Sequence, residues 1–61
     1  MRFEKALEGM REGKKVLHRS CIYFIRDFQL CFVRVDEDTY SVFLAHIDCN
    51  EVLDEDWEFV E

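Results

Sequence analysis

The chain has 61 residues and a formal net charge of −6, and 49% of its residues are hydrophobic. This length allows one domain, and the composition is too apolar and too aromatic for a disordered tail. No run approaches the ~18 uncharged apolar residues that a membrane span needs, and residues 1–5 lack the apolar core of a signal peptide. We therefore expect one domain, 1–61, that is cytoplasmic and has no membrane partner.

The charge is divided unevenly along the chain. Residues 1–19 hold six basic residues against three acids, whereas residues 20–61 hold two arginines against eleven acids. Duplex affinity is built from neutralised phosphates, so an acidic chain of this kind is a poor direct binder of nucleic acid. The simpler alternative, that the acids only keep the protein soluble, stays open.

The first predicted element is a helix near the N-terminus. Phe3, Ala6, Leu7 and Met10 have the spacing of one apolar helix face. Gly13 follows, and glycine readily adopts the left-handed conformation that ends a helix.

Five short apolar segments then predict strands, at 16–17, 21–25, 30–35, 39–45 and 57–60. Connections this short imply antiparallel hairpins. Before the last strand, Asn50 is a candidate cap for one helical turn over 51–54. The predicted fold class is α+β, with an N-terminal helix packed on a four- or five-stranded antiparallel sheet.

Two of these segments predict that the sheet is covered on both faces. Residues 21–25 and 42–45 are apolar at every position, unlike the alternating pattern of a sheet with one wet face. One helix of about ten residues is only ~15 Å long and covers one face. We expect a second copy to supply the other layer, in a homo-oligomer. The alternative is a short, strongly curled sheet that covers itself.

Two His-x-x-Cys pairs, His18 with Cys21 and His46 with Cys49, carry the ligand types of a zinc site. Residues three apart on a strand point to opposite faces, and the glycine or proline of a zinc knuckle is missing. We predict no metal and no cofactor, with the thiols reduced in the core and the histidines half-exposed. The acids at 54–56 lack calcium-loop spacing and are expected to be solvated.

Catalysis is not expected, because no glycine-rich turn presents a Cys or Ser to a positioned base. More residues are suited to binding a small ligand. Tyr23, Tyr40 and Trp57 are suited to stack on a flat base, and Lys15 and Arg19 to meet a phosphate. The alternative for each is a core aromatic or a solvated cation.

Both ends of the chain carry a longer pattern. Residues 3–16 read F-x-x-A-L-x-x-M-x-x-G-K-x-V, and residues 52–60 read V-L-x-x-D-W-E-x-V. These motifs resemble short phage and prophage proteins of the second Thoeris anti-defence family, which open F-x-x-A-L-x-x-L-x-x-G-x-x-V and close D-I-L-A-x-D-W-E-V-V. Asp56 and Trp57 match the closing motif residue by residue. The middle is shorter here, and Cys21 stands where the family has a tryptophan.

The resemblance implies a helix on an antiparallel sheet, assembled into multimers that sequester a cyclic ADP-ribose immune signal near their subunit contacts. We therefore predict a phage-type anti-defence protein that binds a nucleotide-like ligand, in the cytoplasm of an infected or lysogenic bacterium. The predicted ligand-binding residues are Arg19, Tyr23, Asp56 and Trp57.

Two alternatives remain. The first is an acidic protein–protein inhibitor of a bacterial nuclease or effector complex, as many anti-CRISPR proteins are. The acidic second half favours this inhibitor, because it should repel an anionic ligand. The second is a structural accessory protein without a ligand.

Overall fold

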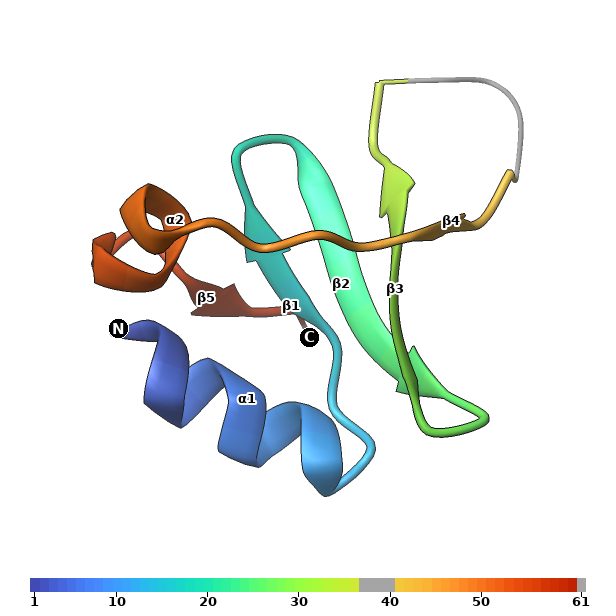
Figure 1. Cartoon of the computed structure of the whole chain (residues 1–61), viewed down its shortest axis with the longest axis horizontal. Helices are drawn as coiled ribbons and strands as arrows, with labels where there is room; N and C mark the ends of the chain where they lie inside the picture. The colour runs from blue at the N-terminus through green and yellow to red at the C-terminus, as the bar shows by residue number, and fades with distance from the viewer. Residues whose placement is uncertain (37–40, 61) are drawn as a thin grey trace.

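The computed structural model of the chain describes residues 1–36 and 41–60. Its five strands form one antiparallel sheet in the order β4-β3-β2-β1-β5 (Figure 1). The prediction of an α+β fold with an N-terminal helix on an antiparallel sheet is confirmed. The elements in chain order are α1 (Phe3–Arg11), β1 (Val16–His18), β2 (Cys21–Arg26), β3 (Gln29–Arg34), β4 (Phe43–Leu44), α2 (Cys49–Leu53) and β5 (Glu58–Phe59).

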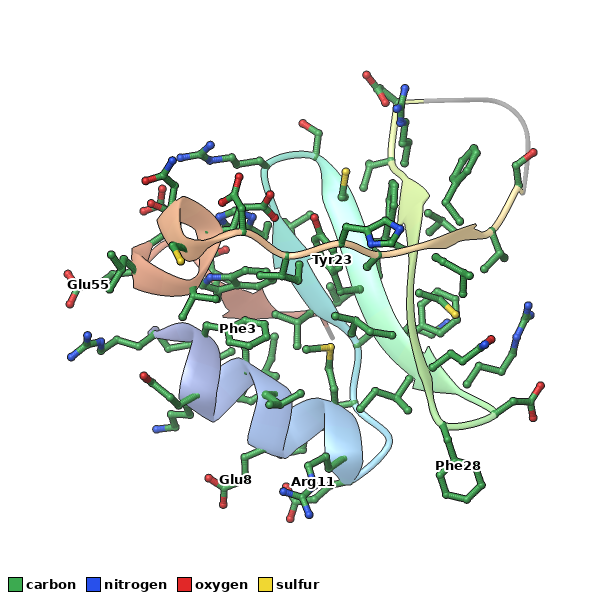
Figure 2. The ribbon with its side chains drawn as sticks, viewed as in Figure 1. Phe3, Glu8, Arg11, Tyr23, Phe28 and Glu55 are labelled. Carbon is green, nitrogen blue, oxygen red and sulfur yellow. The ribbon has the colours of Figure 1, made fainter. Side chains whose placement is uncertain are left out.

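Helix α1 ends as the sequence predicts. Gly13 has a φ of 95°, in the left-handed region, and its N–H donates to the Met10 carbonyl at 3.0 Å. Ala6 and Met10 are buried against the sheet, while Glu8 and Arg11 point away from it (Figure 2). No helix among residues 1–36 and 41–60 is long and apolar enough to cross a membrane.

The two ends of the chain pack against each other. A β-carbon at Gly9 would overlap the Phe59 ring, so glycine is what lets α1 approach β5 so closely. The Met1 ammonium donates to the carbonyl oxygens of Glu55 and Trp57, each at 2.8 Å. The start of α1 is thereby tied to the segment that precedes β5.

The strand register divides the sheet into two faces. Val16, Tyr23 and Phe32 lie opposite one another on neighbouring strands and face α1. Both helices and the 45–48 segment pack on this helix side, so within the described ranges no element covers the other face. We call that other face the outer face. By the alternation of the strands, it carries Leu17, Ile22, Phe24, Cys31, Val33 and Leu44.

The fourth strand is shorter than predicted. Of the predicted 39–45, only Phe43 and Leu44 pair with β3, and residues 39–40 lie outside the described residues. Val42, Phe43 and Leu44 are exposed, so the expectation that both faces of this segment are covered does not hold within one chain. After β4 the chain leaves the sheet edge, because Ala45 and Ile47 pack on the core instead.

The second helix begins earlier than predicted. Asp48, and not Asn50, is its cap, because the extended backbone at Asp48 lets its Oδ1 accept from the Glu51 N–H at 2.9 Å. The final strand is also shorter than the predicted 57–60, since Trp57 is buried ahead of β5.

Two tight turns join β1 to β2 and β2 to β3 without a glycine. Arg19 and Ser20 have φ values of 47° and 64°, and Asp27 and Phe28 have 54° and 63°. Type I′ turns require a positive φ at both central residues and favour Asn-Gly or Asp-Gly. Phe28 is 103% exposed and projects from the tip of its hairpin (Figure 2). It therefore holds an unfavourable backbone conformation with no burial to offset it.

We predict that Phe28→Gly stabilises the protein by about 1 kcal/mol, because an L side chain in the left-handed region costs roughly 1–2 kcal/mol. Thermal unfolding followed by circular dichroism should show a melting temperature several degrees higher. The matched control is Gln29→Gly, at the next position, whose φ is not positive. That change should lower the melting temperature. A lower melting temperature for Phe28→Gly would contradict the prediction.

Candidate functional site

Trp57 lies where both helices meet the sheet. It is 0% exposed, and its ring stacks on His18 with centroids 4.0 Å apart and planes 9° from parallel. Phe3 meets the indole edge-on at 5.0 Å, and Tyr23 lies 5.2 Å from it. Its Nε1–H donates to the Glu51 carbonyl at 2.9 Å. Phe3 and Tyr23 both point into this interior in Figure 2.

His18 forms the polar edge of the cluster. It is 1% exposed, and its Nε2 lies 3.1 Å from Oδ2 of Asp54, the residue that ends α2. Nη2 of Arg19 lies 2.8 Å from the same oxygen, with 63% of the Arg19 side chain exposed. These contacts hold the end of α2 against the β1–β2 turn. A buried imidazole needs such a partner, because an unsatisfied polar group costs about 1–3 kcal/mol.

Two expectations are therefore wrong at this point. His18 is buried, not half-exposed, because strand alternation puts it on the same face as buried Val16. Asp54 is half-buried and ion-paired, whereas the sequence suggested that the acids at 54–56 are solvated. The alternation signal for His18 was present in the sequence. The Asp54 contact had no local signal, because its partners are more than thirty residues away.

Tyr23 is the second polar contact to α2. Burial raises its pKa from 10.0 to about 12, and the negative charge of Glu51 and its interaction with the hydroxyl add to this effect. A negative charge on Cys21 acts in the same direction, and the Arg19 guanidinium acts against it. Tyr23 therefore stays neutral over the ordinary pH range.

The His-x-x-Cys pairs do not converge. His18 and Cys21 do face each other, because the tight turn makes them cross-strand neighbours. His46 and Cys49 are both exposed. In the part of the chain that the structure describes, no group of three or more His, Cys, Asp or Glu side chains is placed to hold a metal. The three thiols are free.

The expectation of core cysteines is correct only for Cys31, which is buried. Cys21 is half-buried. Cys49 is exposed, because it occupies the first residue of α2, a short helix with no buried residue. The prediction is therefore wrong for Cys49.

The structure brings together three of the four predicted ligand-binding residues. Tyr23 and Trp57 are in ring contact inside the molecule, and Arg19 joins them at the surface through Asp54. Asp56 is exposed, and it has no hydrogen bond or ion pair with the other three among the described residues.

The two further candidates lie elsewhere. The Lys15 Nζ lies 5.9 Å over the Phe24 ring, on the outer face. Tyr40 lies outside the described residues.

A second group lies at the same end of the sheet as Arg19. Arg34 is opposite Cys21, which follows the Arg19 turn. The Arg34 guanidinium lies 5.8 Å over the Phe43 ring, which is 40% exposed and stacks on Phe32 with centroids 5.4 Å apart. We call Arg19, Arg34 and Phe43 the arginine end. Neither Arg34 nor Phe43 is among the predicted ligand-binding residues, although Arg34 is one of only two Lys or Arg residues after position 19.

Comparison of the chain with known protein families, curated proteins and solved structures finds no match. The resemblance to the anti-defence family therefore stays a prediction, and the function has to be argued from the geometry.

Trp57→Ala is expected to abolish cooperative unfolding. Deleting a buried aromatic side chain costs about 3–5 kcal/mol, comparable with the whole stability of so small a domain. Circular dichroism on heating would show a broad, non-cooperative change. Trp57→Phe keeps one ring but loses the Nε1–H bond to Glu51 and part of the buried indole volume, so it should melt cooperatively at a lower temperature. A Trp57→Ala protein that melts like the parent and loses only ligand binding would make Trp57 a contact residue.

The raised pKa of Tyr23 predicts a loss of stability in alkali. A tyrosine of pKa near 10 in the unfolded chain and about 12 in the folded chain stabilises the fold fully below pH 10. That stability is lost as the pH rises from 10 through 12. Absorbance at the tyrosinate band of a Tyr40→Phe protein would follow Tyr23 alone, since the chain has two tyrosines. Ionisation near pH 10 in the folded protein would contradict the prediction.

Proposed function

We propose that this protein is a non-catalytic binding protein that sequesters an anionic nucleotide-type immune signal. It does so as a homo-oligomer, in the cytoplasm of a bacterium infected by a phage or carrying a prophage. The observation that carries the proposal is the arginine end, where an exposed Phe43 ring lies beside the Arg34 guanidinium and on the same sheet end as Arg19.

The chemistry of that end suits a nucleotide. A flat base stacks on an aromatic or guanidinium face, and a phosphate accepts paired charge-assisted hydrogen bonds from arginine. Nη2 of Arg19 is paired with Asp54, and most of the Arg19 side chain is exposed. An arginine has five N–H donors, so this ion pair leaves donors with which the exposed side chain could bind a ligand phosphate.

The buried aromatics serve as scaffold in this proposal. Trp57 and Tyr23 are buried under α2, so a base could stack on them only if α2 moved away. Their role is to hold α2, whose Asp54 orients Arg19. Asp56 remains a predicted contact at the surface.

A binding role without catalysis is also consistent with the contacts of His18, the buried histidine. His18 pairs across the strands with Cys21, its ring is stacked on Trp57, and its Nε2 lies within hydrogen-bond distance of Asp54. Only 1% of His18 is exposed, so its ring lies out of reach of a substrate and is assigned a structural role. The proposal therefore includes no reaction.

An inhibitor that binds a protein is the second candidate, favoured by one observation. Residues 48–58 hold six acids and no basic residue. A surface of this charge suits the basic channel of a nuclease or effector complex. Under this reading the arginine end has no ligand.

Isothermal titration calorimetry of the purified protein with cyclic ADP-ribose tests the first candidate. The parent protein should bind. Arg34→Gln should weaken binding about tenfold or more, because a charge-assisted hydrogen bond is worth roughly 1.5–3 kcal/mol. The matched control is Arg26→Gln, an exposed arginine at the opposite end of β2, which should bind as the parent does.

Phage plating then separates the two candidates. Expression of the protein should restore plating on cells whose defence uses a cyclic nucleotide, and Arg34→Gln should not. Absence of nucleotide binding, together with rescue only on cells defended by a nuclease complex, would replace the first candidate with the second.

A further inference from the structure

We infer that the outer face of the sheet is a subunit interface, which packs against the outer face of a second copy of this chain. The inference rests on the homo-oligomer of the proposed function and not on its ligand. It assigns a surface and a packing mode to an assembly that the sequence predicts only in general terms.

The outer face is a continuous apolar surface. Leu17, Ile22 and Val33 form one cross-strand row, and Phe24, Cys31 and Leu44 form the next. Apart from buried Cys31, these side chains are half-buried or exposed, and Leu44 is 56% exposed. A sheet with a wet face would show polar residues at these positions. Six apolar positions in two adjacent rows therefore indicate a covered face.

The surface area of the chain points the same way. A monomer of 7.4 kDa is expected to expose about 4,200 Å². The chain exposes 4759 Å², so the excess is roughly 550 Å². If each of two copies hid an area of this size on its outer face, the pair would bury about 1,100 Å², just above the ~1,000 Å² expected of a specific interface.

A second copy fits this face better than a foreign partner. The rim of the outer face holds the positive residues Lys15 and Arg26 and the negative residue Glu58. A second copy of the same surface therefore offers charges of both signs. A domain of 61 residues also needs its extra stabilisation at all times. Another copy of the chain is present wherever the protein is made, so it supplies this stabilisation without a foreign partner.

The packing mode follows from the edges. The two edge strands, β4 and β5, have two residues each. Strands this short offer too few unpaired backbone groups to join sheets edge to edge. Face-to-face packing of the two outer faces is therefore the mode available, as in a sandwich of two sheets about 10 Å apart.

Sedimentation equilibrium and thermal unfolding of the parent protein test this assembly. The mass should be at least twice 7.4 kDa at micromolar concentration. The melting temperature should rise with protein concentration, because association stabilises the folded state by mass action.

Point variants test which surface is used. Leu44→Lys adds a charge on the outer face at an exposed position, so the fold of one chain should survive while the mass falls to that of a monomer. Ile22→Lys, at the centre of the face, should have the same or a larger effect. Asn50→Lys adds the same charge at an exposed position of α2, on the helix side, and should leave the mass unchanged.

A parent protein of 7.4 kDa with a melting temperature independent of concentration would overturn the inference. So would a Leu44→Lys protein that keeps the mass of the parent, or an Asn50→Lys protein that loses it. These masses are measured without ligand. A dimer that fails to bind nucleotide therefore refutes only the ligand, and a monomer that binds nucleotide refutes only the interface.

Discussion

The buried indole of Trp57 is the contact on which the rest of the structure depends. It touches Phe3 of α1, Tyr23 of β2 and His18 of β1, and its N–H holds the Glu51 carbonyl of α2. No other residue described joins both helices to the sheet in this way. Helix α2 buries none of its own residues, so it is held by polar contacts around this ring and not by a hydrophobic face. The position of Arg19, through Asp54, follows from that attachment.

The sequence predicted well what depends on neighbours and poorly what depends on distant contacts. The apolar stripe of α1 and the two-residue turns are local signals, and helix, hairpins and fold class follow from them. Asp54 meets His18 and Arg19 only because β5 pairs beside β1, which no short pattern encodes. For the same reason the sequence left Tyr23 and Trp57 open as ligand contacts or core aromatics, and the structure shows that both are buried. Arg34 was missed because its relation to Phe43 is a cross-strand one.

The α1 side of the sheet, its outer face and the arginine end differ in composition. Apolar packing under α1 gives the fold, and no element among the described residues covers the outer face. The acids of residues 48–58 lie around α2, and one of them, Asp54, pairs with Arg19 at the arginine end. In the proposed function an anionic ligand meets the arginine end, and acids that lie beyond the screening length of ~8 Å at physiological salt act on it only weakly.

Strands with apolar side chains on both faces have a register that the hydrophobic pattern specifies only weakly. In most sheets a shift of one residue in the strand register would point the core side chains toward solvent. The hydrophobic pattern therefore disfavours the shift. In β2 and β3 a slip would exchange one apolar set, such as Ile22 and Phe24, for another, such as Tyr23 and Ile25. The pattern therefore does not choose between the two alignments, and the choice falls to the Arg19–Ser20 and Asp27–Phe28 turns. An insertion of one residue in either turn would yield a chain that still forms an apolar sheet but presents the wrong side to its helix, and such misaligned sheets are prone to join into fibres.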